Sequence, residues 1–228
     1  MWSRLLWFTG STLLGVSGQV YAQGRGGPQA DFLVDAQFAF TSSKSKLVGS
    51  NDTGTALRYG LGAYAGSNSN LAFLLHFDRD VTNFQLNDSQ VDMNWQDTRV
   101  RYHMSYFYLG AVLSRLEMKA ERETVEIVDA AGSGMGFNAG TMFTVGRNGS
   151  IAFDILSVSV PNMKNSVDQT LAIKSRLDID IGASIDLTSK LLDMTFGYKT
   201  RNLTIVTDTS YQDILTSTYV GLRMSLYF

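Results

Sequence analysis

The chain has 228 residues, a net charge of −2, 44% hydrophobic and 18% charged residues, and no cysteine. The near-neutral charge gives no reason to expect a nucleic-acid partner. The lack of cysteine excludes a disulfide scaffold, a thiolate metal site and a lipid anchor on cysteine.

The first residues predict a cleaved signal peptide. Arg4 precedes an uncharged run from Leu5 to Gln23, and Val20 and Ala22 place small residues where a signal peptidase recognises its substrate. An uncleaved membrane anchor is the alternative, but Ser, Thr, Gly and Gln interrupt the run, which makes it too weakly apolar for a good span. We therefore predict a signal peptide over 1–22, a short segment over 23–30 and one domain over 31–228.

The rest of the chain alternates apolar and polar residues with a period of two, which indicates strands with two different faces. Phe32, Val34, Ala36, Phe38 and Phe40 form the first apolar face, opposite Asp35 and Gln37. Ten such segments are predicted, near 31–41, 55–66, 71–77, 96–103, 106–118, 135–145, 151–160, 176–186, 192–201 and 218–228. The fourth and fifth are the weakest, so eight strands is the alternative count.

The predicted connections alternate in length. Short turns fall near 66–70, 103–106, 146–149 and 187–190, and the strongest turn signal is Gly146-Arg147-Asn148-Gly149. Longer polar connections are predicted near 42–54, 79–94, 119–134, 161–172 and 202–213.

The last segment has the clearest pattern. Its apolar face is Val220, Leu222, Met224, Leu226 and Phe228, and its other face is mixed and wettable. This segment resembles the closing strand of a bacterial outer-membrane β-barrel. A soluble β-sandwich also alternates, but its outward face would carry mostly Lys, Glu and Thr. Here the less apolar face holds opposite charges and glycines, as expected of a narrow polar lumen.

The predicted fold is therefore all-β: a closed, antiparallel, up-and-down transmembrane barrel, most consistent with ten strands. The chain has a general likeness to small OmpA- or OmpW-like barrels, without a motif specific to one family. That resemblance implies the outer membrane of a Gram-negative-type bacterium, both termini in the periplasm, and contact with membrane lipids and lipopolysaccharide. It also implies a monomer that is escorted by periplasmic chaperones, with the last strand read by the barrel-assembly machinery.

The alternation also predicts which charged residues face the interior. They are Arg58, Asp78, Arg99, Arg101, Asp154, Arg176, Asp178, Asp180, Asp193, Lys199, Arg201 and Arg223. A ten-stranded barrel is little wider than its own side chains require, and an unpaired buried charge is costly. We therefore predict an ion-paired plug, with an open polar conduit as the alternative.

Two arrangements could carry chemistry, although no catalytic site, cofactor or metal is predicted. His76, Asp78 and Asp80 share one face near the expected outer end of the third strand, which resembles the Asp/His arrangement of the omptin outer-membrane proteases. No second acidic pair accompanies them. His103 and Ser105 with Glu117 resemble the lipid A deacylases, in which Ser is the nucleophile, but aromatic residues follow Ser105 and the turn separates it from Glu117.

The predicted function is a non-enzymatic barrel with a structural, adhesive or narrow-transport role through its outer loops. The alternative is an outer-membrane hydrolase of the lipid A deacylase or omptin type.

Overall fold

The computed structural model describes residues 32–46, 51–65, 70–86, 89–104, 107–122, 125–146, 148–165, 170–188, 191–206 and 210–227. The predicted signal peptide, the segment 23–30, Ser105 and Phe228 lie outside these residues. Among the residues described, no helix is long and apolar enough to cross a membrane.

The described residues form ten strands that meander in sequence order. They are β1 (Phe32–Ser45), β2 (Asn51–Ala65), β3 (Asn70–Leu86), β4 (Ser89–Met104), β5 (Phe107–Arg122), β6 (Val125–Val145), β7 (Gly149–Asn165), β8 (Thr170–Asp186), β9 (Leu192–Val206) and β10 (Ser210–Tyr227). Each strand pairs antiparallel with the next one.

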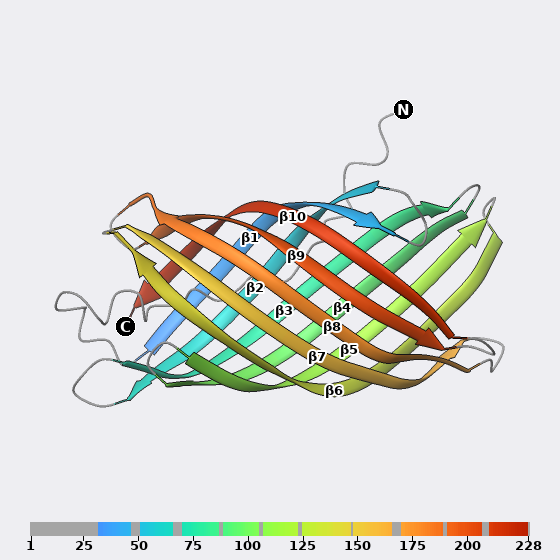
Figure 1. The fold of residues 1–228 in the computed structure, drawn as a ribbon, viewed down its shortest axis with the longest axis horizontal. Helices are drawn as coiled ribbons and strands as arrows, with labels where there is room; N and C mark the ends of the chain where they lie inside the picture. The colour runs from blue at the N-terminus through green and yellow to red at the C-terminus, as the bar shows by residue number, and fades with distance from the viewer. Residues whose placement is uncertain are drawn as a thin grey trace.

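The first and last strands close the barrel. β1 pairs with β10 from Leu33↔Tyr227 to Ser45↔Leu215, so the sheet has no free edge (Figure 1). Closure satisfies the backbone hydrogen bonds that hydrocarbon cannot satisfy. The predicted ten-stranded up-and-down barrel is confirmed, and both the eight-stranded count and the sandwich are excluded.

The prediction of long polar connections is wrong. β3 and β4 remain paired up to Leu86↔Ser89, and β5 and β6 up to Arg122↔Val125, so residues 79–86, 89–94, 119–122 and 125–134 belong to the wall. We name this end of the barrel the far rim. The strands that lead to its hairpins are therefore longer than predicted and extend beyond the predicted strand ends. The opposite end, where β1 begins and β10 ends, is the near rim.

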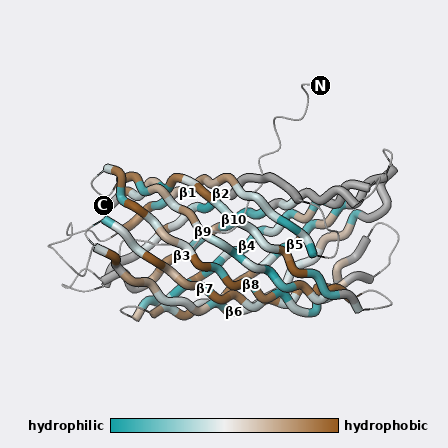
Figure 2. Tube along the Cα trace, turned by 45° about the horizontal axis from the view of Figure 1, so that its top comes forward, coloured by the Kyte–Doolittle hydropathy of each residue, from teal (hydrophilic) through white to brown (hydrophobic). Residues whose placement is uncertain are grey.

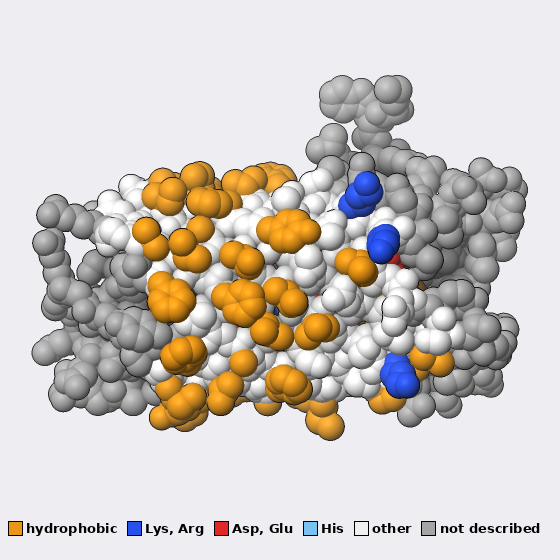
Figure 3. Space-filling model, in the orientation of Figure 1, with side chains coloured by type: hydrophobic (Ala, Val, Ile, Leu, Met, Phe, Trp, Pro, Cys, Tyr) orange, Lys and Arg blue, Asp and Glu red, His pale blue; other side chains and the backbone are white. Residues whose placement is uncertain are grey.

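The outer wall carries a continuous band of exposed hydrophobic side chains, which we name the apolar belt. Each strand contributes to it: Phe40, Tyr59, Phe77, Val100, Leu113, Phe137, Ile151, Ile181, Phe196 and Leu222. Figure 2 shows apolar and polar positions interspersed along the strands. In Figure 3 the hydrophobic side chains gather over the part of the barrel nearer the C-terminus, and Lys and Arg side chains lie at the other edge of the belt.

The belt has the height expected of a membrane-spanning barrel. On β1 it extends from Phe32 to Phe40, and at about 3.4 Å per residue and a tilt of about 40° this covers about 20 Å. Val220, Leu222, Met224 and Leu226 of β10 also face outward and are exposed. Hydrophobic side chains face outward and charged ones inward, so the barrel is inside-out over this height.

Toward the far rim the interior changes from charged to apolar. Thirteen buried hydrophobic residues form one cluster there, which we name the apolar plug: Met93, Trp95, Val112, Leu116, Met118, Ala130, Leu156, Val158, Val160, Met163, Ile173, Leu203 and Leu215. The interior is therefore polar over only part of its length, and the prediction of a polar, largely ion-paired lumen did not include this apolar part. Above the belt, water meets the outer wall, so burying hydrophobic side chains in the interior stabilises the projecting half as it does a soluble protein.

Candidate functional site

The barrel interior gathers most of the buried charge of the described chain. Every charged residue predicted to face inward is buried there, because strand alternation directs it away from the belt. Contacts among most of these residues, together with Asp97, form one connected network, which we name the charge lattice. Its members are Arg58, Asp78, Asp80, Asp97, Arg99, Arg101, Asp154, Arg176, Asp178, Lys199 and Arg201.

Arg99 of β4 is the first centre of the lattice. Its guanidinium contacts Asp78 at 2.9 Å, Asp154 at 3.1 Å and Asp97 at 3.3 Å. Asp78 also pairs with Arg58 of β2. Because Asp154 belongs to β7, these contacts join strands that are not neighbours in the wall.

Asp154 is held from several sides. Arg101 lies 3.5 Å from it, Tyr108 donates a hydrogen bond at 2.7 Å, and Asn138 donates another at 3.1 Å. Hydrogen bonds to an ionised carboxylate are among the stronger ones in proteins. The carboxylate is therefore fixed by β4, β5 and β6 together.

Arg176 of β8 is the second centre. Its Nη2 contacts Asp97 Oδ2 at 2.9 Å and Asp178 Oδ2 at 2.6 Å, and Ser114 donates to Asp97 at 2.6 Å. The Arg176–Asp97 pair spans the interior from β8 to β4. It therefore crosses the space that an open conduit would need.

A third group bridges β9 and β3. Lys199 and Arg201 contact Asp80 at 2.9 Å and 2.7 Å, and Arg201 also contacts Asp178 at 3.0 Å. Because Asp178 also contacts Arg176, these contacts connect β9 and β3 to the second centre. The lattice thus links β2, β3, β4, β7, β8 and β9 at the height where the belt ends.

Trp95 joins the charge lattice to the apolar plug. Its ring is fully buried, and the guanidinium carbons of Arg176 and Arg201 lie 4.4 Å and 5.2 Å from ring centroids. Cation–π attraction at such distances stabilises both the ring and the charges. The polar and apolar parts of the interior are therefore packed against each other.

Two tyrosines lie over glycines on the neighbouring strand. A Cβ at Gly140 would lie 2.2 Å from the Tyr108 hydroxyl, and a Cβ at Gly197 would lie 2.2 Å from the Tyr219 hydroxyl. Tyr219 donates to Asp180 at 3.0 Å, as Tyr108 does to Asp154. Glycine at both positions therefore leaves space for a ring that orients a buried carboxylate.

Toward the near rim, the interior is less fully paired. Arg223 pairs with Asp193, and His76 Nε2 lies 3.7 Å from Asp35 Oδ2, which is too long for a direct hydrogen bond. Neither oxygen of Asp35 and neither ring nitrogen of His103 has a hydrogen-bond partner. Buried polar groups of this kind are commonly satisfied by internal water.

The arrangement of His76, Asp78 and Asp80 is not that of a rim protease. All three residues face inward, but Asp78 is engaged by Arg58 and Arg99, and Asp80 by Lys199 and Arg201. The Nδ1 atom of His76 lies 3.3 Å from Arg101. The three side chains therefore lie inside the wall, each with a different partner.

His103 and Glu117 do not meet. His103 pairs with Tyr108 in the ladder and faces inward, whereas Glu117 lies nine residues farther along β5, about 30 Å away at the rise of a strand. Glu117 contacts Arg115 at 2.9 Å on the outer wall. Opposite faces and this separation prevent a triad, whatever the position of Ser105.

The structure adds interior residues that the prediction did not include. Asp97 precedes Arg99 by two positions in the same predicted strand, and Asp35 lies opposite the first predicted apolar face, so the strand phase indicates both. Asp213 lies in the predicted connection 202–213, where no strand phase was assigned. Trp95 lies between the predicted connection 79–94 and the predicted strand 96–103, so the sequence prediction gave it no face. Among the described residues, no group of three or more His, Asp or Glu side chains is arranged to hold a metal ion.

No family model and no curated protein matches the chain. Similar solved structures include the translocator domain of autotransporter NalP from Neisseria meningitidis, with 14% identity, 90% coverage of each chain and a TM-score of 0.46. The β domain of the Bordetella autotransporter BrkA has 12% identity and a TM-score of 0.44, covering 86% of this chain and 100% of its own. The outer-membrane protease OmpT from Escherichia coli has 8% identity and a TM-score of 0.42, covering 90% and 100%.

Proposed function

We propose that the protein is a non-enzymatic outer-membrane β-barrel with a closed interior, which serves a structural or adhesive role through its far rim. The single observation that carries this proposal is the charge lattice, whose ion pairs cross the interior instead of lining it. A selective conduit needs a continuous hydrated path, and the lattice fills the height at which that path would pass.

The lattice closes the interior because its pairs join opposite sides of the wall. Arg176 of β8 reaches Asp97 of β4, and Arg201 of β9 reaches Asp80 of β3. Above these pairs lies the apolar plug, which ions do not enter without losing their hydration. These features therefore do not favour the narrow-transport role.

The belt and the far rim support the proposed location and orientation. An inside-out barrel with a belt of about 20 Å matches the apolar band of bacterial outer-membrane barrels, which is about 25 Å tall. Such barrels have short periplasmic turns and larger extracellular parts. The projecting strands therefore favour a far rim outside the cell and both chain termini in the periplasm.

The hydrolase alternative finds no support in the geometry. The carboxylates near His76 are occupied by cations, and Glu117 lies on the opposite face of the wall from His103. A general base must first be within reach of the group it serves.

Single-molecule conductance in planar bilayers tests the proposal. The purified protein is expected to insert without steady conductance steps, because the lattice and plug leave no hydrated path. Removing the crossing cation and the ring packed against it, by combining Arg176→Ala with Trp95→Ala, is expected to produce measurable steps, whereas Phe137→Ala on the outer wall should not. Regular, voltage-independent steps from the unaltered protein would rule out a closed interior.

A further inference from the structure

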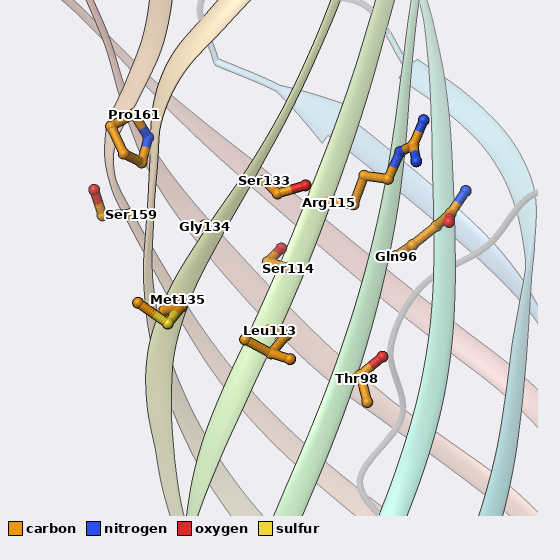
Figure 4. Close-up of a pocket in the computed structure, with 10 residues that line it drawn as sticks. All are labelled: Gln96, Thr98, Leu113, Ser114, Arg115, Ser133, Gly134, Met135, Ser159 and Pro161. Atoms are coloured by element: carbon orange, nitrogen blue, oxygen red, sulfur yellow. The ribbon is translucent and has the colours of Figure 1, made fainter.

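The part of the wall that the structure describes has a hollow, which is lined mostly by outer-wall residues and reaches the buried Ser114. A groove of about 690 Å³ opens across β4, β5, β6 and β7. Figure 4 shows the residues around it coming from these four neighbouring strands, with Arg115 and Gln96 side by side. Its volume lies within the range of small-molecule sites.

The groove exists because the wall is irregular there. The β6–β7 register shifts between Ala131 and Met135, and the groove is lined at this point by Ser133, Gly134 and Ser159. A Cβ at Gly134 would lie 1.7 Å from the carbonyl oxygen of Ser159, so the backbones approach too closely for any side chain. Small residues and a register shift thus leave a hollow in the wall.

The groove lies across the edge of the apolar belt. Leu113 and Met135 belong to the belt and face outward, with exposed fractions of 59% and 73%. The next outward positions are Arg115 and Ser133. One end of the groove therefore faces acyl chains, and the other end faces the level of lipid headgroups.

A row of hydrogen-bond donors borders the headgroup end. Arg79, Gln96, Arg115 and Ser133 are directly paired across β3, β4, β5 and β6. Side chains at such positions are neighbours, about 5 Å apart at Cβ. No carboxylate interrupts this row.

The outward-facing carboxylate that follows Arg115 on β5 lies farther from the belt and is already engaged. Glu117 contacts Arg115 at 2.9 Å and accepts a hydrogen bond from Asn94 at 3.0 Å. The Arg115 side chain is nevertheless 57% exposed. A guanidinium has five N–H donors, so Arg115 retains donors for a second anion.

We propose that this groove binds one phosphorylated membrane lipid. An acyl chain lies over Leu113 and Met135, and the phosphate accepts hydrogen bonds from the donor row at Arg79, Gln96 and Arg115. A lipid is the occupant because the groove is continuous with the belt, and a phosphate is the headgroup because the row offers donors and positive charge. The inference depends on membrane insertion but not on a closed interior.

Native mass spectrometry of the detergent-purified protein, titrated with diphosphoryl lipid A, tests the site. The unaltered protein is expected to bind one molecule saturably, and Arg115→Ala to weaken binding by about tenfold through loss of a charge-assisted contact. Ser133→Phe, which fills the groove from an exposed position, is expected to abolish the saturable adduct.

Lys174→Ala is the matched control, because Lys174 is an exposed cation on β8, outside the groove. Its affinity should equal that of the unaltered protein, and heat-modifiable gel mobility confirms that every variant is folded. Equal losses in Arg115→Ala and Lys174→Ala would overturn the proposal, since they would indicate general charge attraction. Equal affinity for dephosphorylated lipid A would also overturn it, as would saturable binding by Ser133→Phe.

Discussion

The buried charges matter individually because each one compensates more than one neighbour. Arg176 contacts Asp97, Asp178 and the face of Trp95. Removing it leaves two carboxylates in a desolvated interior with fewer partners. Breaking a buried ion pair from one side is much more costly than the pair itself is stabilising.

Arg176→Met, which keeps an unbranched apolar stem but removes the guanidinium, is expected to lower the free energy of unfolding by about 3–5 kcal/mol. The exposed pair Arg115–Glu117 provides the comparison, and Arg115→Met should change stability by less than about 1 kcal/mol. Urea unfolding in lipid vesicles, followed by gel mobility, measures both. A similar small effect in the two variants would contradict the role given to the lattice.

The sequence alone predicted whether a side chain points into the barrel or out of it, but not which residue it contacts. Alternation alone directed Arg99, Arg176 and Asp178 inward, because a strand has only two faces. It could not pair Arg176 with Asp97, which is 79 residues away in sequence, because that contact depends on closure and register. The groove could not be predicted either, since it depends on a register shift between β6 and β7.

At the scale of the strand, the inward face changes along its length from apolar to charged side chains. On β4 the inward side chains are Met93 and Trp95 toward the far rim, followed by Asp97, Arg99 and Arg101. The outward side chains change in the opposite sense, from polar Asn94 and Gln96 to Val100 and Tyr102. The period of two is unbroken along the strand. The projecting part could therefore be predicted from sequence if the apolar face is expected to change from the outer side to the inner side of the wall.

The β3–β4 hairpin should therefore behave as wall and not as loop. Amide hydrogen exchange of the protein in lipid nanodiscs is expected to show strong protection over 79–86 and 89–96, because the ladder from Arg79↔Gln96 to Leu86↔Ser89 is continuous.

Trp95→Ala offers an internal control for that measurement. It should accelerate exchange in the projecting part of the hairpin while the belt residues 73–77 keep their protection. Exchange within seconds over 79–86 in the unaltered protein would show that this stretch is a loop.

At the scale of the whole molecule, the barrel combines two packing regimes on one sheet. Within the belt, lipid surrounds the wall and charges fill the interior. Beyond it, water surrounds the wall and the plug fills the interior. The same alternating sheet forms both parts of the barrel. The charge lattice lies where the two parts meet and closes the interior at that level.

The fluorescence of Trp95 measures whether solvent enters the apolar plug, because Trp95 is the one tryptophan outside residues 1–22. In protein lacking these residues, its emission should be quenched far less by acrylamide in the folded state than in urea. Arg176→Ala should increase the quenching, and Phe137→Ala should not, since Phe137 lies on the outer wall. Fluorescence that is quenched equally in the folded and urea-unfolded protein would show that the plug is open to solvent.

The pairing of β1 with β10 has a consequence for biogenesis. Until the final strand is in place, β1 and β9 each present a row of unsatisfied amides and carbonyls, which lipid tails do not tolerate. Insertion and ring closure must therefore be nearly simultaneous, or a catalyst must shield both edges in the meantime. A polypeptide truncated before Ser210 should accumulate as an aggregation-prone intermediate and not as a smaller cylinder.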